Sequence, residues 1–313
     1  MHVAVAIVAF RNAEDVLGCL AALARSTYRD FEVIVVENGG PEAFTALSKV
    51  LPAELAGGQT VRAVEAPSNL GYAGGVNLCI EETPKADAWW VLNPDTEPYA
   101  DALELQVARL AAGDCDAVGC TIHLPDGRVQ SHGGRWNGWL ARAVSMGHGS
   151  ALEPAPDPSA VERLQNYLNG ASMLVGRRFV EAAGPMREDY FLYCEEVEWC
   201  LRARTKGMRL GYAPGARILH HQGTSTGNAV DIRAKGRMPV YLNERNRLNL
   251  TRDRFPMRMP VVALACLATT LVRYGRRRAW RQAAYALAGW WAGVRNLRGH
   301  PPPSADGAGE GAS

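Results

Sequence analysis

Short apolar runs alternate with helical patterns along the first part of the chain, and this alternation limits the fold more than any other feature of the sequence. β-Branched runs at residues 3–8 and 33–36 flank a segment, 13–24, whose valine and leucines fall on one helical face. Further strands are expected at 61–64 and 88–92. Such alternation buries parallel strands between helices. We therefore expect an α/β fold with a Rossmann-like, mostly parallel central sheet flanked by helices.

The pattern changes beyond residue 116. A strand at 117–123 meets a Pro-Asp-Gly turn that favours a hairpin, and residues 131–160, rich in Gly, Pro and Ser, are expected to form a long surface excursion. Helices at 177–183 and 195–206 then lead to a strand at 208–212. Helical segments follow to the end of the regular pattern, which predicts a C-terminal helical appendage.

Positive charge is concentrated in this appendage. The formal net charge is only +2, yet from Arg254 to Arg298 there are many Arg residues and no Asp or Glu. The apolar run at 261–272, about 12 residues long, is shorter than the roughly 20 that span a bilayer. Together with the Trp residues that follow, it predicts helices that associate with an anionic membrane surface. A helical cap or an oligomer interface is the alternative, and the apolar and Trp content argues against nucleic acid as a partner.

The cysteines and the first residues bear on the compartment. Seven Cys residues are scattered without CxxC or zinc-like spacing, which indicates free thiols in a reducing environment. The run from Val3 to Val8 follows Met1 directly, without the basic segment and cleavage site of a secretory leader. We expect a cytoplasmic protein that is peripheral at the inner face of the cell membrane.

Polar residues follow the first two strands, at the edge where an open parallel sheet binds its ligands. Ala9-Phe10-Arg11-Asn12 precedes a helix whose amino terminus favours anions. Glu37-Asn38-Gly39-Gly40 places one carboxylate beside residues that tolerate left-handed backbone geometry, and such a carboxylate can accept hydrogen bonds from a base or ribose. Taken singly, an Asn cap and an Asn-Gly turn are the simpler explanations.

Two further segments follow later strands. Residues 68–77, SNLGYAGGVN, hold enough glycine for the backbone to approach a nucleotide, although they lack the GxGxxG spacing of a dinucleotide site. Asn93-Pro94-Asp95-Thr96 follows a buried strand, and Asp95 together with substrate phosphates can hold Mg²⁺ or Mn²⁺. A proline-induced turn is the alternative for the second segment.

Carboxylates and histidines supply the remaining candidates. Glu195, Glu196 and Glu198 begin a helix behind an aromatic strand, where the helix amino terminus stabilises negative charge. A Glu at this place is expected to stay ionised and to act as a general base, although capping or an ion pair from Glu198 explains at least one of the three. His220 and His221 end a strand, so only one of them can face the site as a metal or phosphate ligand.

Taken in this order, the segments resemble the family 2 glycosyltransferases of the GT-A fold, and most closely their bacterial rhamnosyltransferase-like branch. The resemblance is carried by VAIVAFRNAEDVLGCLAAL, VIVVENGG, NLGYAGGVN, VLNPDTEP, the stretch from NGASMLVGRR to ARILHH, and NERNRLNL. It implies a GT-A domain at 1–252, with a nucleotide-binding half at about 1–125 and an acceptor and catalytic half at about 126–252. Basic, Trp-containing helices at 253–299 and a disordered tail at 300–313 follow.

The resemblance also implies roles for single residues. The expected nucleotide contacts are Ala9, Phe10, Arg11, Glu37, Asn69, Gly71, Asn77 and Asn93. Asp95 would be the metal carboxylate of a DxD-like motif, and His220, with His221 as its neighbour, would assist the metal or the diphosphate. Arg245 and Arg247 would face the diphosphate or the acceptor.

Glu195 and Glu196 correspond to the family's Glu-Asp pair, so Glu196 falls where the catalytic base is expected. Glu replaces Asp here, as it does at Glu37, and a misplacement of about 1 Å can cost on the order of 100-fold in rate. Either the pocket compensates for the longer side chain, or Glu195 takes the role.

The resulting hypothesis is an inverting, metal-dependent hexosyl transfer from a nucleotide-sugar donor to a hydroxyl of a saccharide or lipid-linked saccharide, in bacterial cell-surface polysaccharide or glycolipid synthesis. The first choice of donor is dTDP-rhamnose, with a UDP-hexose or galactofuranose donor behind it. Glu196 would remove the acceptor proton, and Mg²⁺ or Mn²⁺ on Asp95 would neutralise the departing diphosphate. An inactive, glycosyltransferase-like carbohydrate-binding protein is one alternative. A nucleotidyltransferase is another, but AFRNAED lacks the basic Gly-rich loop expected of it.

Overall fold

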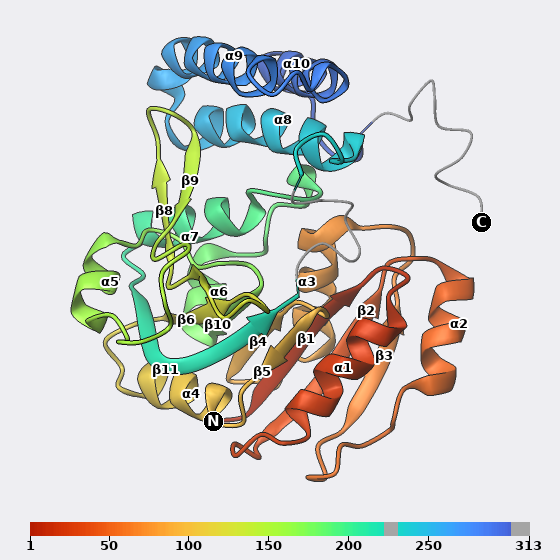
Figure 1. Ribbon diagram of the computed structural model, residues 1–313. Helices are drawn as coiled ribbons and strands as arrows, with labels where there is room; N and C mark the ends of the chain where they lie inside the picture. The colour runs from red at the N-terminus through yellow and green to blue at the C-terminus, as the bar shows by residue number, and fades with distance from the viewer. Residues whose placement is uncertain (222–230, 302–313) are drawn as a thin grey trace.

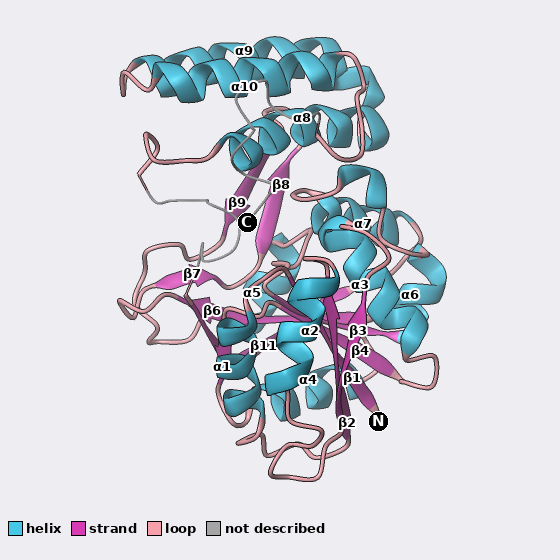
Figure 2. Ribbon diagram, turned by 90° about the vertical axis from the view of Figure 1, so that its right-hand side faces the viewer, coloured by secondary structure: helices cyan, strands magenta, loops and turns pink. Residues whose placement is uncertain are grey.

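The structure, a computed structural model, describes residues 1–221 and 231–301 (Figure 1). A sheet at its centre carries helices on both faces, and a helical layer from the last third of the chain lies above one end (Figures 1 and 2). The α/β, mostly parallel architecture expected from the sequence is confirmed. The tail expected to be disordered lies outside the described residues from position 302 onward.

One side of the sheet is parallel, in the order β3-β2-β1-β4. Its strands are β1 (Val3–Ala9), β2 (Phe31–Glu37), β3 (Val61–Glu65) and β4 (Ala88–Leu92). The chain moves outward from β1 to β3 and then returns to β4 on the other side of β1. This reversal leaves the carboxyl ends of β1 and β4 facing the same space, which is where open α/β sheets bind ligands.

The other side of the sheet is mixed and continues β4-β10-β6-β11-β5, with β7 paired to β6. These strands are β5 (Thr96–Pro98), β6 (Ala117–His123), β7 (Val129–Ser131), β10 (Ser172–Gly176) and β11 (Leu210–His220). β10 runs antiparallel to β4 and β6, while β6 and β11 are parallel. β11 continues eight residues beyond the predicted end of its strand at 212, and its last residues pair with β5.

Strand alternation divides the core between the two faces of the sheet. Val3, Val5 and Ile7 pack with the helices α1 (Ala13–Leu23), α2 (Pro41–Val50) and α4 (Ala102–Ala111). The opposite face of the sheet is covered by α3 (Gly71–Glu82), α6 (Arg177–Ala183) and α7 (Glu195–Thr205). A Cβ placed at Gly75 would lie 2.5 Å from Val8, so glycine lets α3 approach the sheet closely. All seven cysteines are buried and free, as the scattered spacing predicted.

The excursion expected at 131–160 has regular structure of its own. It contains the hairpin β8 (Gly134–Asn137) and β9 (Arg142–Ser145), and the helix α5 (Pro158–Leu164) begins near its end. The prediction of a loose surface segment was therefore incomplete. In Figure 2 the hairpin rises from the sheet toward the helical layer.

Three helices form this layer: α8 (Arg237–Arg254), α9 (Met259–Gly275) and α10 (Trp280–Val294). A short 3-10 turn, η2 (Pro256–Arg258), joins the first two helices, where the prolines interrupt the helical pattern. α9 and α10 lie side by side above α8 and are the outermost elements in both views (Figures 1 and 2). Pro256–Gly275 is long and apolar enough to cross a membrane by length and composition.

Candidate active site

The ends of β1 and β2 form one hydrogen-bonded unit. Ala9 pairs with Glu37 in the sheet, and the buried Glu37 carboxylate accepts hydrogen bonds from the backbone N–H groups of Arg11, at 3.0 Å, and Gly39, at 2.7 Å. Arg11 Nε donates to the Gly39 carbonyl at 3.2 Å, and the exposed Phe10 ring lies beneath its guanidinium. The four residues expected at the nucleoside pocket are thus brought together. One Glu37 oxygen is already committed to organising the two loops.

The glycine-rich segment at the start of α3 meets this unit on one side and the loop before α7, residues 191–194, on the other. Asn38 donates to the Gly71 carbonyl at 2.9 Å, and Asn69 accepts from Gly71 N–H at 3.1 Å. Gly71 has φ +70°, and a Cβ there would lie 2.2 Å from the carbonyl oxygen of Phe191. Glycine is therefore required both for the backbone conformation and for this contact.

Asn77 lies on α3 and faces away from the strand ends. Its amide nitrogen donates to Met186 O at 2.9 Å and to Glu188 Oε1 at 2.8 Å, and its oxygen accepts from Met186 N–H at 2.8 Å. The buried Asn77 side chain therefore joins α3 to residues 186–188. A bracing role replaces the nucleotide contact that was expected of Asn77.

Asp95 and His220 lie side by side because their strands are paired. His220 is opposite Thr96 in the β11–β5 ladder, and its Nε2 lies 3.2 Å from Asp95 Oδ1. The other ring nitrogen, Nδ1, is 2.8 Å from Gln130 Oε1 on β7, which fixes the orientation of the ring. His221 points elsewhere, with Nε2 2.9 Å from Glu97 Oε1. As the strand geometry required, only one of the two histidines faces Asp95.

The Asp95–His220 pair fits a divalent cation that takes its remaining ligands from a substrate. A carboxylate oxygen and an imidazole nitrogen suit Mn²⁺, and Mg²⁺ commonly binds one or two carboxylates together with phosphates. Within residues 1–221 and 231–301, no group of three His, Cys, Asp or Glu side chains gathers in a way that holds a metal alone. Asn93, expected in the first position of the motif, uses its backbone N–H on Ala171 O at 3.0 Å.

The loop before α7 is held in an unusual conformation. Phe191, Tyr193 and Cys194 all have positive φ values, 67°, 73° and 71°, which are costly for residues other than glycine. The Asn246 amide nitrogen on α8 compensates, because it lies within 2.9 Å of the carbonyl oxygens of Tyr190, Leu192 and Tyr193. Strain of this kind persists only where surrounding contacts over-determine it, and here it sets where α7 begins.

The two glutamates at the start of α7 differ in environment. Glu195 is buried, and burial followed by the negative charge of Glu196 raises its pKa well above the usual value. Its Oε2 has no hydrogen-bond partner in the described parts of the chain. Glu196 is half-buried, and burial raises its pKa to about 6 although backbone N–H groups at the helix end oppose the shift. The expected dominance of the helix terminus was therefore wrong: desolvation outweighs it.

Glu196 adjoins two groups that the sequence did not single out. A Cβ placed at Gly170 would lie 3.5 Å from Glu196 Cγ and 3.6 Å from the Tyr72 hydroxyl. Tyr72 itself, on α3, donates to the Gly170 carbonyl at 2.5 Å. Glu198, the third carboxylate, is buried and accepts from Arg202 at 3.1 Å, as the structural alternative predicted.

Arg245 and Arg247 do not occupy the places expected of them. Arg245 is 1% exposed and donates to Asn246 Oδ1, Gly299 O and Tyr190 O, so it braces the interior and does not face a diphosphate. Arg247 donates to Ala141 O and to the Glu244 carboxylate, and thereby ties α8 to the β8–β9 hairpin. A basic motif indicates charge, but not which face of a helix will be buried.

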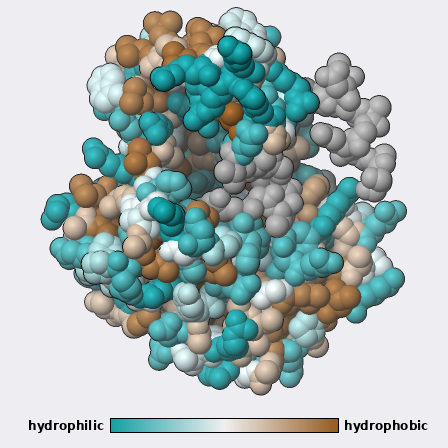
Figure 3. Space-filling model, viewed as in Figure 1, coloured by the Kyte–Doolittle hydropathy of each residue, from teal (hydrophilic) through white to brown (hydrophobic). Residues whose placement is uncertain are grey.

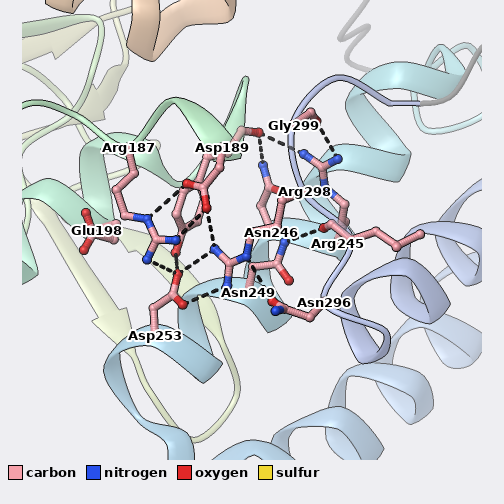
Figure 4. A network of polar contacts seen from close by, with 12 residues as sticks. Arg187, Asp189, Glu198, Arg245, Asn246, Asn249, Asp253, Asn296, Arg298 and Gly299 are labelled. Atoms are coloured by element: carbon pink, nitrogen blue, oxygen red, sulfur yellow. Dashed lines mark hydrogen bonds and ion pairs between the residues drawn. The ribbon is translucent and has the colours of Figure 1, made fainter.

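A polar network joins the segment before α7 to the chain that follows α10 (Figure 4). Arg298 donates to both oxygens of Asp253 on α8, at 2.8 Å each, and to Asp189 at 3.1 Å. Gly299 N–H donates to the Asp189 carbonyl at 2.7 Å, and the His300 ring packs edge-on against Phe191 with centroids 4.7 Å apart. The segment after α10 thus contacts the loop that precedes Glu195 and Glu196.

Asn246, Gln130 and Tyr72 are the site residues that sequence reasoning missed. Asn246 and Tyr72 lie inside the motifs NERNRLNL and NLGYAGGVN, in which the charged and glycine positions carried the predictions. An asparagine between two arginines was the available signal for Asn246. For Gln130 there was none, because its position beside His220 depends on pairing between strands distant in sequence.

Comparisons with known proteins bear on this arrangement. Residues 4–148 match the profile "Glycosyl transferase family 2". An uncharacterised protein of Sinorhizobium fredii is 29% identical over 235 residues, 71% of this chain and 25% of that protein, so the chain spans about a quarter of the length of that relative. The N-acetylglucosaminyl-diphospho-decaprenol L-rhamnosyltransferase of Mycobacterium tuberculosis is 28% identical over 66% of this chain and 72% of its own. The low-salt glycan biosynthesis hexosyltransferase Agl10 of Haloferax volcanii is 22% identical over 76% and 77%.

Among solved structures, the Pyrobaculum calidifontis mannosyltransferase in complex with GDP-Man and Mn²⁺ superposes with a TM-score of 0.55 at 15% identity, covering 94% of this chain and 87% of that one. This likeness establishes the GT-A fold. The profile match extends through the ends of β1, β2 and β4, where Glu37 and Asp95 lie, and reaches the β8–β9 hairpin. Sequence profile and fold agree that residues 4–148 of the chain belong to glycosyl transferase family 2.

Proposed function

We propose that this protein transfers a hexosyl group from a nucleoside-diphosphate sugar to a hydroxyl of a glycan acceptor, with inversion at the anomeric carbon. The observation that carries the proposal is the position of Tyr72, because its hydroxyl and the Glu196 side chain both adjoin Gly170. Burial, followed by the negative charges of Glu195 and Glu196 and, more weakly, that of Asp95, raises the pKa of the Tyr72 hydroxyl well above its usual value. The residues expected to hold the diphosphate side and the acceptor side of a transfer reaction therefore share one small region.

Glu196 is the base in this mechanism. With its pKa raised to about 6 by burial, it is mostly ionised at neutral pH yet basic enough to accept a proton. It takes the proton of the acceptor hydroxyl as that oxygen bonds to the anomeric carbon. The bond from that carbon to the diphosphate breaks on the opposite side, and the diphosphate leaves with the electron pair.

Glu195 is a poor candidate for the same role. Its carboxyl is buried, and the neighbouring negative charge of Glu196 adds to the effect of burial in favouring the protonated form. A carboxylic acid that keeps its proton cannot accept one from the acceptor. We infer that the added methylene of Glu196 is accommodated by the gap beside Gly170, which has no side chain to fill it.

Asp95 and His220 hold the diphosphate side. Gln130 fixes the orientation of the His220 ring. His220 Nε2 therefore lies 3.2 Å from Asp95 Oδ1, and both atoms can serve as ligands of one cation. A bound Mg²⁺ or Mn²⁺ would supply Lewis-acid stabilisation of the charge that develops on the leaving diphosphate. The protein's own part is to orient these ligands before the substrate arrives.

For the donor we propose dTDP-rhamnose, on the similarity to the mycobacterial L-rhamnosyltransferase. The acceptor is a saccharide or lipid-linked saccharide of a bacterial cell-surface polysaccharide, and transfer takes place at the inner face of the membrane. Glu37, with one oxygen held by the N–H groups of Arg11 and Gly39, is oriented by backbone and adjoins the predicted nucleoside pocket.

A panel of nucleotide sugars, each with Mn²⁺, tests the proposal in two assays. The first measures the thermal shift of the protein, and the second measures sugar transfer to a lipid-linked monosaccharide, which becomes a disaccharide. We expect dTDP-rhamnose to raise the melting temperature of both the wild type and Glu196→Gln, and product to form only with the wild type. Stabilisation without turnover in the wild type would favour the alternative of an inactive, carbohydrate-binding protein. Product formation by Glu196→Gln at the wild-type rate would remove Glu196 from the mechanism.

A further inference from the structure

The outermost helices carry a surface that the transfer reaction does not use. We propose that the outer face of α9 and α10 docks on an anionic phospholipid bilayer, with lipid phosphates received among the arginines at the end of α9. The proposal deepens the function proposed above, on which its purpose rests, because it names the surface and the lipid chemistry that would hold the enzyme beside a membrane acceptor.

α9 has two contrasting faces. Val262, Cys266, Thr270 and Tyr274, spaced four apart, are buried against the rest of the protein. The outer face carries exposed apolar side chains, of which Val261 is 57%, Leu264 68%, Leu271 51% and Val272 56% exposed. A row of exposed leucine and valine on one helix face is costly in water and is typical of an interaction surface.

α10 extends this surface with two tryptophans. Trp280 and Trp291 are 68% and 55% exposed, and Ala284 and Ala288 lie between them on the same exposed face. Tryptophan favours the boundary between lipid headgroups and acyl chains, because its ring is apolar while its N–H is polar. Near the opposite end of α9, Arg258 lies 4.4 Å from the ring of Trp139, which is exposed at the tip of the β8–β9 hairpin.

Arginines border the apolar face. At the end of α9 a hollow of about 600 Å³ is lined by three arginines, Arg273, Arg276 and Arg277, together with Ala268, Thr269 and Val272. Burial, followed by the positive charge of Arg273, lowers the pKa of nearby Lys235. In Figure 3, brown side chains lie over the top of the molecule, next to a group of hydrophilic ones.

Charge complementarity selects the occupant. No Asp or Glu lies between Asp253 and Asp306 in the sequence, so this layer carries positive charge without compensation from its own segment. Each cation near an anionic leaflet adds to the binding, and arginine can keep its head among phosphates while its stem lies along apolar surface. A second copy of this chain would bring another set of arginines against the same face, which disfavours self-association there.

The packing of α9 indicates how it meets the lipid. Pro256–Gly275 is long enough to span a bilayer, but one side of α9 is buried against the protein and contacts α8 and α10. Withdrawing it into a membrane would expose that buried side and uncover the layer beneath. We therefore assign α9 an orientation parallel to the membrane plane, with its outer face among the headgroups.

Co-sedimentation of the full chain with vesicles tests this proposal. We expect the wild type to bind phosphatidylglycerol vesicles at least ten-fold more tightly than phosphatidylcholine vesicles, and to bind more weakly at high salt. Arg276→Glu with Arg277→Glu should reduce binding to the anionic vesicles at least ten-fold, and Leu264→Ser should weaken it without changing the salt dependence. Inorganic phosphate at millimolar concentration should not compete, because the bilayer and not a free anion is the ligand.

The matched control is Lys49→Glu with Lys85→Glu, which changes the net charge equally at exposed positions outside this layer. The control should bind vesicles like the wild type. Equal binding by the Arg276/Arg277 variant, or competition by free phosphate, would overturn the proposal, as would a dimer in light scattering that Leu264→Ser dissociates. Transfer to a soluble acceptor analogue should be unchanged in the Arg276/Arg277 variant. Loss of vesicle binding with intact transfer separates this proposal from that of the enzyme function.

Discussion

Arg298 holds Asp253 through two nitrogens, each 2.8 Å from a different carboxylate oxygen, and so fastens the chain beyond the last helix to α8. Asp253 in turn accepts a hydrogen bond from the Tyr190 hydroxyl at 2.7 Å, next to the strained loop that precedes Glu195 and Glu196. Arg298 is therefore a positioning residue for that loop, although it lies far from it in the sequence.

Replacing Arg298 by Ala is expected to lower kcat about ten-fold or more while the KM for the donor stays unchanged. The loop before α7 loses its support, whereas the loops after β1 and β2, which are expected to bind the nucleotide, keep theirs. Arg298→Lys should recover only part of the rate, since an ammonium group cannot make the two-pronged contact. Steady-state kinetics with the exposed Arg295→Ala as control would check this. A rise in donor KM would instead place the effect of Arg298 on donor binding, and an unchanged midpoint of thermal unfolding would exclude a loss of folded enzyme as the cause of the lower kcat.

Glu196→Gln should reduce transfer by at least about 1,000-fold, and Glu195→Gln should retain most of the activity, because only Glu196 has to accept a proton. In the wild type kcat/KM should rise with pH through about 6, since the base works in its ionised form and its pKa is raised to about 6. The Glu195→Gln profile should keep this limb. If Glu195→Gln were the inactive variant, the two roles would have to be exchanged.

Glu195→Gln is also expected to stabilise the protein at neutral pH. A carboxyl whose pKa is raised in the folded state binds its proton more tightly than in the unfolded state, so its contribution to stability is present at low pH and is lost as pH rises above the usual Glu pKa of about 4.5. Gln removes the buried ionisable group, and a gain of roughly 0.5–2 kcal/mol is reasonable for such a change. Urea unfolding at pH 5 and pH 8 should show the gain mainly at pH 8.

Asp95→Asn should abolish the stabilisation that Mn²⁺ gives to the enzyme with its donor, and chelation with EDTA should do the same to the wild type. Gln130→Ala should weaken Mn²⁺ binding by about 10- to 100-fold, because it frees the His220 ring without removing a ligand. Titration calorimetry in the presence of the nucleoside diphosphate measures both. Unaltered Mn²⁺ affinity in Asp95→Asn would place the metal elsewhere.

Gly71→Ala should destabilise the protein by roughly 2–4 kcal/mol, because the new Cβ meets both an unfavourable φ and the Phe191 carbonyl. Gly113 offers a matched comparison: it has φ +79°, but a Cβ there meets nothing within 4 Å. Gly113→Ala should therefore cost only about 1–2 kcal/mol. Equal midpoints of thermal unfolding for the two variants would mean that the close contact between Gly71 and the Phe191 carbonyl adds no further cost to the Gly71→Ala substitution.

Local pattern was a good guide to some elements and silent on others. The strands at 88–92 and 117–123 and the helix at 177–183 were predicted to the residue, because each is bounded by a sharp change in polarity. α2 was missed, although Gly40-Pro41 marks its start and Phe44, Leu47 and Val50 follow at helical spacing. The hairpin predicted at the Pro-Asp-Gly turn is confirmed by the antiparallel pairing of β7 with β6. The short strand β5 depends on pairing with β11, and nothing within its three residues encodes that pairing.

The site followed the same division. Asp95 and His220 were identified from their places at strand ends, where topology alone brings side chains together. The protonation of Glu195 was misjudged, because burial arises from the surrounding fold and outweighs a helix end that the sequence does reveal. The expected contact between Arg245 and the substrate failed because burial again arises from the surrounding fold. Arg245 is buried on α8 against the carbonyl oxygens of Tyr190 and Gly299, which are distant from it in the sequence.

α8 passes straight through the domain boundary inferred at residue 252, with Asn246 on one side of that boundary and Asp253 on the other. α9 and α10 are consequently not an interchangeable module. Any recombination that fused residues 1–252 to another C-terminal region would have to supply a new cationic partner for Asp189 and Asp253, or leave the loop before α7 without its support. Variation among relatives should therefore be freer on the outer faces of α9 and α10 than in the short stretch after them.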